Sequence, residues 1–180
     1  MNTSNPYETL VSLSERGEAV YRELPPRESA HTHWTGIGFS LLGQGFVVSM
    51  DEVAELMRVP SATRVPGVKN FVLGIANIRG RLMVIIDLAV FFGERSRLPR
   101  AQRRILAFEE DELYLGFVVD ASLGMQHFPS DSYYKETEDL PEMFRPFTGG
   151  SYKTGGATWP IIDLSAFAGH PEFEKLNTID

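Results

Sequence analysis

The distribution of hydrophobic and polar positions divides the chain near residue 34. Before that point, apolar residues separated by three, seven and four positions alternate with charged ones, at Leu10, Leu13, Val20 and Leu24. This spacing predicts one amphipathic helix over residues 7–24, ended by the proline pair at 25–26 because proline cannot continue a helix. After residue 34, short runs alternate apolar with small or polar residues and are interrupted by glycine. That second pattern is typical of β-strands joined by turns.

Four hairpins are predicted in the second part of the chain. They cover residues 35–50, 72–88, 104–120 and 144–167, with turns at 43–45, at 79–81, at 109–112 and at the two Gly-Gly pairs of the last segment. Within the second hairpin, residues 82–86 are continuously apolar, which predicts a strand buried on both faces.

The segments between the hairpins give weaker patterns. Residues 51–59 fit a short helix or a strand, and the β-rich surroundings favour the strand; residues 121–128 are expected to form another. A loop with one short turn of helix is expected over residues 129–146, and a short helix from His170 onward. About ten short strands separated by glycine turns predict an all-β barrel or sandwich.

One stretch of sequence occurs twice. The ten residues from Val84 read VIIDLAVFFG and the ten from Pro160 read PIIDLSAFAG, 76 positions further on. A single repetition at this distance indicates two related halves rather than a repeat array. The simplest architecture is two small barrels that each end with the same strand and helical turn. Asp87 and Asp163, the repeated acids, are predicted to cap these turns by accepting backbone N–H groups, and not to form a catalytic pair.

Composition excludes several functions. The net charge of −7 argues against nucleic acid, which needs clustered Lys and Arg. The only basic cluster, RSRLPRAQRR at residues 95–104, is interpreted as a solvated connection. No cysteine is present, so disulfides and thiol catalysis are excluded. The apolar runs are far shorter than the roughly 20 residues that span a bilayer, and the N-terminus lacks a signal-peptide pattern. We therefore expect a cytoplasmic protein with no direct membrane insertion.

The sequence offers little catalytic chemistry. Neither nucleotide-binding glycine fingerprint occurs, and no serine lies in a G-x-S-x-G elbow. His31 and His33 flank Thr32 and would supply two metal ligands, but no third ligand lies nearby. We expect no catalytic residue, no bound metal and no cofactor, and so a binding module rather than an enzyme. A metal-assisted enzyme on a β-barrel, using His31 and His33, stays the competing hypothesis.

Two segments carry a family resemblance. VLGIANIRGRLMVIIDL at residues 72–88 resembles the signature of the CheW family of chemotaxis coupling proteins, and LYLGFVVDASLGMQHF at residues 113–128 is similar to a second family stretch. The resemblance implies two five-stranded SH3-like β-barrels around a shared core, here with an added N-terminal α-helix and a short C-terminal helix. It places a helical extension and linker at residues 1–33, the CheW-like domain of two interleaved lobes at 34–169, and a tail at 170–180.

The resemblance also implies function by contact alone. Family members bridge the cytoplasmic tip of a methyl-accepting chemoreceptor to the regulatory domain of a CheA-type histidine kinase, and such an adaptor would be recruited to membrane-associated receptor arrays. The receptor-binding positions that carry over are Val53, Glu55, Gly74, Asn77 and Arg79. Glu55 and Arg79 are expected near one another, with Arg79 paired to a carboxylate, and Gly74 is expected to allow close approach of a receptor helix. Kinase contacts are expected from exposed apolar residues at the barrel ends, without named positions.

The N-terminal pattern narrows the resemblance. The predicted helix with its Pro-Pro break, and WTGIGFSLL at residues 34–42, are similar to the adaptors of the twitching-motility chemosensory system of type IV pili, the PilI group. An adaptor for a flagellar chemotaxis pathway is the alternative.

Overall fold

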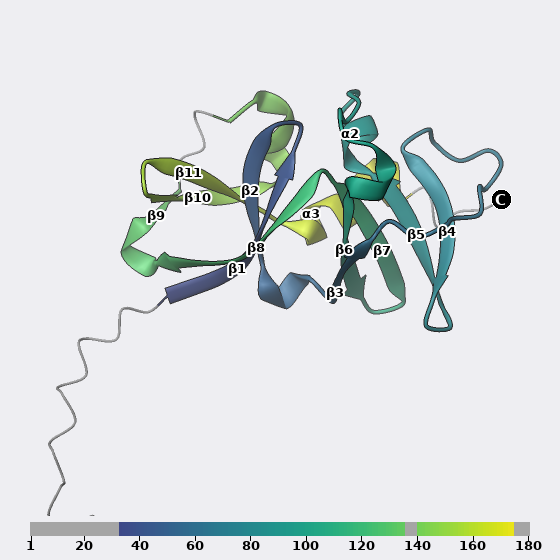
Figure 1. Ribbon diagram of the computed structural model, residues 1–180, viewed down its shortest axis with the longest axis horizontal. Coiled ribbons are helices and arrows are strands. Elements are labelled where there is room, and N and C mark those ends of the chain that lie inside the picture. The colour runs from purple at the N-terminus through teal and green to yellow at the C-terminus, as the bar shows by residue number, and fades with distance from the viewer. Residues whose placement is uncertain (1–32, 136–139, 175–180) are drawn as a thin grey trace, which may run out of the picture. The chain divides into compact units, whose positions relative to one another are not determined.

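The computed structural model describes residues 33–135 and 140–174 (Figure 1). The predicted helix at residues 7–24, the linker and His31 lie outside these residues. Within them the chain forms two β-sheets, with strand order β8-β1-β2-β11-β10-β9 in the six-stranded sheet and β3-β6-β7-β5-β4 in the five-stranded sheet. The strands are β1 (His33–Leu41), β2 (Gln44–Ser49), β3 (Glu55–Arg58), β4 (Val72–Ile78), β5 (Arg81–Asp87), β6 (Arg104–Glu110), β7 (Leu113–Val119), β8 (Ala121–Pro129), β9 (Tyr133–Tyr134), β10 (Thr148–Thr154) and β11 (Ala157–Ile162).

Short helical segments join the strands. Residues 33–135 and 140–174 contain three α-helical and four 3₁₀-helical segments: α2 (Leu88–Phe91), α3 (Leu164–Ala168), α4 (Pro171–Glu174), η1 (Met50–Glu52), η2 (Arg100–Gln102), η3 (Ser130–Ser132) and η4 (Glu142–Phe147). The all-β class predicted from glycine-punctuated alternation is confirmed. Five strands were expected in each unit, and one sheet has five. The other sheet has a sixth strand because the two residues of β9 pair with β10.

All four predicted hairpins are present as antiparallel pairs, β1–β2, β4–β5, β6–β7 and β10–β11. Some details were wrong. Residues 51–59 divide between η1 and β3, and β9 lies within the expected loop at 129–146, where η3 and η4 supply helical turns of the expected kind. Only Gly155-Gly156 makes a turn, since Gly149 and Gly150 lie inside β10 at a register shift. Leu82 is 67% exposed while Met83 is fully buried, so β5 is not buried on both faces over its whole length.

The repeated sequence is a structural repeat. Strand β5 leads into α2 and pairs in parallel with β7, and β11 leads into α3 and pairs in parallel with β2. The likeness extends over residues 71–93 and 147–169, where nine positions are identical. Gly74 and Gly150, 76 positions apart, have φ angles of 137° and 136°. The two sheets are therefore copies of one five-stranded unit.

The repeat had suggested two consecutive halves of the chain, but the two copies exchange strands. The connection after β2 carries β3 into the five-stranded sheet, and β8 leaves β7 to pair with β1 in the six-stranded sheet. Two backbone hydrogen bonds mark equivalent crossover points, from Ala54 N–H to Ala107 O at 2.8 Å and from Asp120 N–H to Ser40 O at 2.9 Å. Each sheet thus has one edge strand, β3 or β8, that the chain supplies by crossing over from the other sheet. In chain order, the repeated strand and helical turn are the last elements of the six-stranded sheet, whereas β6 and β7 of the five-stranded sheet follow them.

The buried side chains form three clusters. The largest combines residues of β1, β2, β5, β6, β7 and β11 with α2, α3 and η4, so it joins the two sheets into one core. Phe147 and Phe167 stack within it at 4.0 Å between ring centroids. A second cluster around Met83 and Ile105 belongs to the five-stranded sheet, and a third around Phe128 belongs to the six-stranded sheet. The expected shared core is present, with a smaller core on each sheet.

Candidate functional site

The repeated aspartates cap helices, as predicted. Asp87 Oδ1 accepts the backbone N–H groups of Ala89 and Val90 at 3.1 and 3.4 Å, and Asp163 Oδ1 accepts that of Ala166 at 3.0 Å. Each aspartate follows a buried strand, so its carboxylate reaches the free N–H groups of the helical turn that begins next. Each carboxylate is thus engaged by the N-terminus of its own helical turn.

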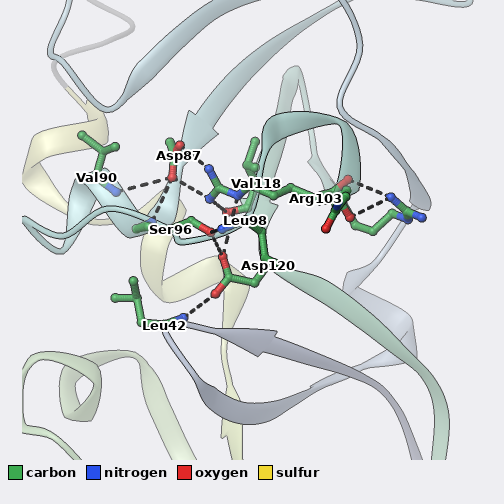
Figure 2. Close-up of polar contacts among 11 residues, drawn as sticks. Leu42, Asp87, Val90, Ser96, Leu98, Arg103, Val118 and Asp120 are labelled. Carbon is green, nitrogen blue, oxygen red and sulfur yellow. Dashed lines mark hydrogen bonds and ion pairs between the residues drawn. The ribbon is translucent and has the colours of Figure 1, made fainter.

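Asp87 also belongs to a buried ionic cluster that sequence reasoning missed (Figure 2). Arg103 donates from Nη1 to Asp87 Oδ2 at 2.6 Å and from Nη2 to Asp87 Oδ1 at 2.8 Å, and its Nε lies 3.7 Å from Asp120 Oδ1. Arg103, Asp87 and Asp120 are only 6%, 5% and 7% exposed. The interpretation of residues 95–104 as a solvated connection was therefore wrong for Arg103. A signal was available in the sequence, because this arginine lies just before the continuous apolar run Ile105–Phe108 of β6, which is buried.

The cluster connects the two sheets. Asp120 lies at the crossover from β7 to β8, and its Oδ2 accepts the N–H of Leu42 at 2.7 Å, in the β1–β2 turn of the six-stranded sheet. Its other oxygen accepts the hydroxyl of Ser96 and faces Arg103. Buried carboxylates need such partners because an unpaired charge loses its hydration. Arg103 is thus held between a cap of the five-stranded sheet and the crossover that leads to the other sheet.

The predicted receptor-binding residues converge on the β4–β5 turn and the start of β3. Arg79 Nη2 donates to Glu55 Oε1 at 2.8 Å, with side chains 80% and 29% exposed. Arg79 is at the tip of the hairpin with φ 53°, and Asn77 Oδ1 accepts the N–H of Gly80 at 2.8 Å. Asn77 therefore shapes the turn that presents Arg79. The expected proximity of Glu55 and Arg79, and the pairing of Arg79 with a carboxylate, are found in the structure.

A second ion pair continues this charged surface. Arg81 Nη1 lies 2.6 Å from Glu109 Oε2, and its guanidinium stacks over the ring of Tyr114 at 4.7 Å. Burial raises the pKa of the Tyr114 phenol, and the nearby negative charge of Glu55 raises that pKa further. Two ion pairs, formed by residues of β3, the β4–β5 hairpin and β6, therefore lie on this part of the five-stranded sheet.

Gly74 is needed for the fold of this chain, and its contact with a receptor helix stays a prediction. Its φ of 137° is accessible mainly to glycine, and a Cβ there would lie 2.2 Å from the carbonyl oxygen of Thr63. Thr63 forms an isolated β-bridge with Ile75, so this chain's own backbone makes the close approach at Gly74. Val53 is half-buried against the shared core, between η1 and β3. It is therefore adjacent in sequence to the charged pair and is partly a packing residue.

The equivalent surface of the six-stranded sheet has different chemistry. Gly155 occupies the position of Arg79 in the repeat, and Ala121 occupies that of Glu55, opposite Ser40 after the crossover. Instead of an ion pair, this sheet exposes Leu123 and Met125 on β8, at 44% and 57%. The two copies of the scaffold thus differ in the ion pair, whereas both expose apolar side chains, since Leu56 and Leu82 of the five-stranded sheet are 40% and 67% exposed.

The described part of the chain shows neither a candidate metal site nor a helix that could span a membrane. His33 opens β1, and no group of three or more His, Cys, Asp or Glu side chains within residues 33–135 and 140–174 is arranged to hold a metal ion. Among the helices of these same residues, none combines the length and the apolar character needed to cross a bilayer.

Comparison with known proteins agrees with this architecture. The profile of the CheW-like domain family matches residues 35–172. The chain is 37% identical over 172 residues to Protein PilI of Pseudomonas aeruginosa, covering 96% of each, and 27% identical over 138 residues to the probable chemotaxis protein CheW of Rhizobium etli, covering 77% and 89%. The crystal structure of the scaffolding protein TtCheW from Thermoanaerobacter tengcongensis superposes with a TM-score of 0.68 at 25% identity, covering 77% of this chain and 94% of that one. The chain therefore belongs to the CheW-like family of non-catalytic coupling scaffolds.

Proposed function

We propose that this protein couples the cytoplasmic tip of a methyl-accepting chemoreceptor to the regulatory domain of a CheA-type histidine kinase, in the chemosensory system that controls twitching motility by type IV pili. The similarity to Protein PilI over 96% of both chains carries the assignment to the pilus system. The protein acts in the cytoplasm, at membrane-associated receptor arrays.

The divergence of the two repeated sheets supports binding of two different partners. An adaptor needs two separate docking surfaces, and a duplicated scaffold provides two equivalent positions. One position carries the Glu55–Arg79 ion pair, whereas the other carries exposed Leu123 and Met125. Complementary charges give specificity, so the copy that carries the ion pair suits a different partner from the copy that lacks it.

The receptor site comprises Val53, Glu55, Gly74, Asn77 and Arg79. A receptor helix docks with its apolar face against the protein, in the helix-in-groove mode. An exposed ion pair such as Glu55–Arg79 contributes only about 0–1 kcal/mol by itself. Its role is orientation: Glu55 holds the guanidinium of Arg79 in one position, where it pairs with a receptor carboxylate. Gly74 and Asn77 act indirectly, by keeping β4 and its turn in shape.

The kinase site is assigned to the apolar surface of β8, at Leu123 and Met125. Both side chains lie on an edge strand of the six-stranded sheet. This follows the expectation of exposed apolar residues at the barrel ends, and it leaves the charged turn of the other sheet free for the receptor.

Binding measurements with two purified fragments test the proposal. The wild type, Arg79→Glu and Arg64→Glu are titrated separately with a receptor-tip fragment and with the kinase regulatory domain. Arg64 is exposed and outside the proposed site, so Arg64→Glu controls for the change in net charge. We expect Arg79→Glu to weaken receptor binding about tenfold or more, because it places a second negative charge beside Glu55, and to leave kinase binding unchanged.

Other outcomes would contradict parts of the proposal. Failure of the folded wild type to bind either fragment would remove the coupling role. Equal losses for Arg64→Glu and Arg79→Glu would remove the assigned receptor site. Stronger binding to a flagellar receptor than to a pilus receptor would favour the alternative pathway. Stoichiometric metal in protein purified without an affinity tag would revive the metalloenzyme hypothesis based on His31 and His33.

A further inference from the structure

A pocket of about 530 Å³ lies where segments attached to the two sheets meet. Its lining comes from the end of β1 and the β1–β2 turn, from residues 94–98 after α2, from Asp120 at the crossover, and from Met143 in η4. This volume falls within the range of small-molecule sites, which often lie between two structural units. The proposed receptor residues do not line the pocket.

The pocket accounts for two arginines that the rest of the structure leaves unused. Five arginines lie within residues 95–104 of a chain whose net charge is −7. Three have partners: Arg100 donates to Pro60 O at 2.7 Å, Arg103 to Asp87, and Arg104 to Gln102 O at 3.0 Å.

The other two, Arg95 and Arg97, are exposed and form no hydrogen bond or ion pair with any residue in 33–135 or 140–174. Both line the pocket. The two arginines of this cluster that have no partner among the described residues therefore line one cavity.

The acidic groups of the pocket do not neutralise these arginines. Asp120 already accepts the N–H of Leu42 at 2.7 Å and the Ser96 hydroxyl, and it faces the guanidinium of Arg103. Glu94 is the remaining acid of the lining. Two cations against one uncommitted acid favour a ligand that carries negative charge.

We propose that this pocket binds a small organic anion. Arg95 and Arg97 hold its carboxylate or phosphate group at the rim, since guanidinium groups bind either anion through paired N–H donors. Ser40 supplies a hydroxyl, and Leu42, Leu98 and Met143 contact an apolar body of a few carbon atoms. Because the lining comes from both sheets, the bound anion contacts both at once. This inference does not depend on the proposed coupling function.

Titrations of the full-length, ¹⁵N-labelled protein followed by NMR test this site. The probes are hexanoate, inorganic phosphate and hexylammonium, which separate the contributions of the carboxylate, the phosphate and the apolar body. We expect hexanoate, phosphate or both to give saturable shifts at residues 40–43 and 95–98, and hexylammonium to give none there. The double variant Arg95→Gln/Arg97→Gln is expected to weaken anion binding about tenfold or more.

The matched control removes two exposed arginines elsewhere, as Arg58→Gln/Arg64→Gln, and is expected to bind like the wild type. Equal weakening in both double variants would show a general effect of net charge and would overturn the site. So would the absence of saturable shifts with both anions up to about 10 mM, which corresponds to a free energy too weak for specific recognition. Binding of hexylammonium as tightly as hexanoate would overturn the assigned ligand charge.

Discussion

Replacing Arg103 by methionine should destabilise the protein more than any substitution of an exposed arginine. The variant removes the two hydrogen bonds to Asp87, at 2.6 and 2.8 Å, and the ion pair with Asp120 at 3.7 Å. Methionine fills much of the space of the arginine stem, so the main cost is electrostatic. Both carboxylates are at least nine-tenths buried and would lose the buried cation that pairs with them. Removing one partner of a buried ion pair costs about 3–5 kcal/mol.

That loss is large compared with the free energy of unfolding of a typical domain, which is about 5–15 kcal/mol. Urea denaturation followed by circular dichroism would measure it, and the midpoint of thermal unfolding should fall by roughly 6–20 °C. Arg64→Met, at an exposed position, is the matched control and should change the free energy of unfolding by less than about 0.5 kcal/mol.

A third variant separates the electrostatic reasoning from simple loss of packing. In Asp87→Asn/Arg103→Met/Asp120→Asn the whole cluster is neutral, so no unpaired charge remains buried. It should be more stable than Arg103→Met, since neutral replacement of a complete buried ion cluster costs less than removal of one partner. A loss under about 1 kcal/mol for Arg103→Met, or a triple variant no more stable than the single one, would refute the reasoning.

Two further predictions concern the backbone and pH. Gly74→Ala should lower the free energy of unfolding by about 2 kcal/mol or more in urea titrations, because the added Cβ would lie 2.2 Å from Thr63 O. The control is Gly43→Ala, at φ 81° with no atom within 4 Å of the Cβ position, which should cost only about 1 kcal/mol. Equal losses for the two variants would argue against the steric explanation. Burial raises the pKa of Glu52 above its ordinary value of 4.5, although the hydrogen bond from the Leu164 N–H opposes this rise. The carboxyl therefore takes up a proton more readily in the folded state than in the unfolded state. Its contribution to stability is full below about pH 4.5 and is lost as the pH rises through the raised pKa. Glu52→Gln should remove that decline from a stability–pH profile measured by urea denaturation, and an unchanged profile would contradict the assignment.

The hairpins and caps were predictable because their causes are local. Alternating apolar positions determine which side chains share a strand face. Turns are marked by glycine, which adopts positive φ angles, or by asparagine, whose side chain accepts a backbone N–H of the turn. The Asn77–Gly80 turn and the two capping aspartates needed no information from distant residues. Boundaries were less accurate where neighbours in space decide them, as at β9, whose two residues form a strand only because β10 lies beside them.

The proximity of Glu55 and Arg79 was predicted, but the structural role of Gly74 was not. The family signature placed Glu55 and Arg79 together although they are 24 residues apart, and the structure brings them to 2.8 Å. The reason for Gly74 could not be read from the sequence, because the atom that excludes a Cβ belongs to Thr63 on a separate segment. Arg103 was misjudged for a similar reason, since its two carboxylate partners come from the ends of β5 and β7.

The sequence by itself determined that this chain is a duplicated all-β protein, because alternation, turn residues and the recurring Ile-Ile-Asp-Leu segment are properties of short stretches. Only the tertiary structure decided which strands share a sheet. The exchange of β3 and β8 between the two copies, the shared core and the burial of Arg103 all depend on contacts between segments distant in the chain. Burial and strand pairing depend on the three-dimensional fold. A short stretch of sequence therefore does not determine that two similar units exchange their edge strands.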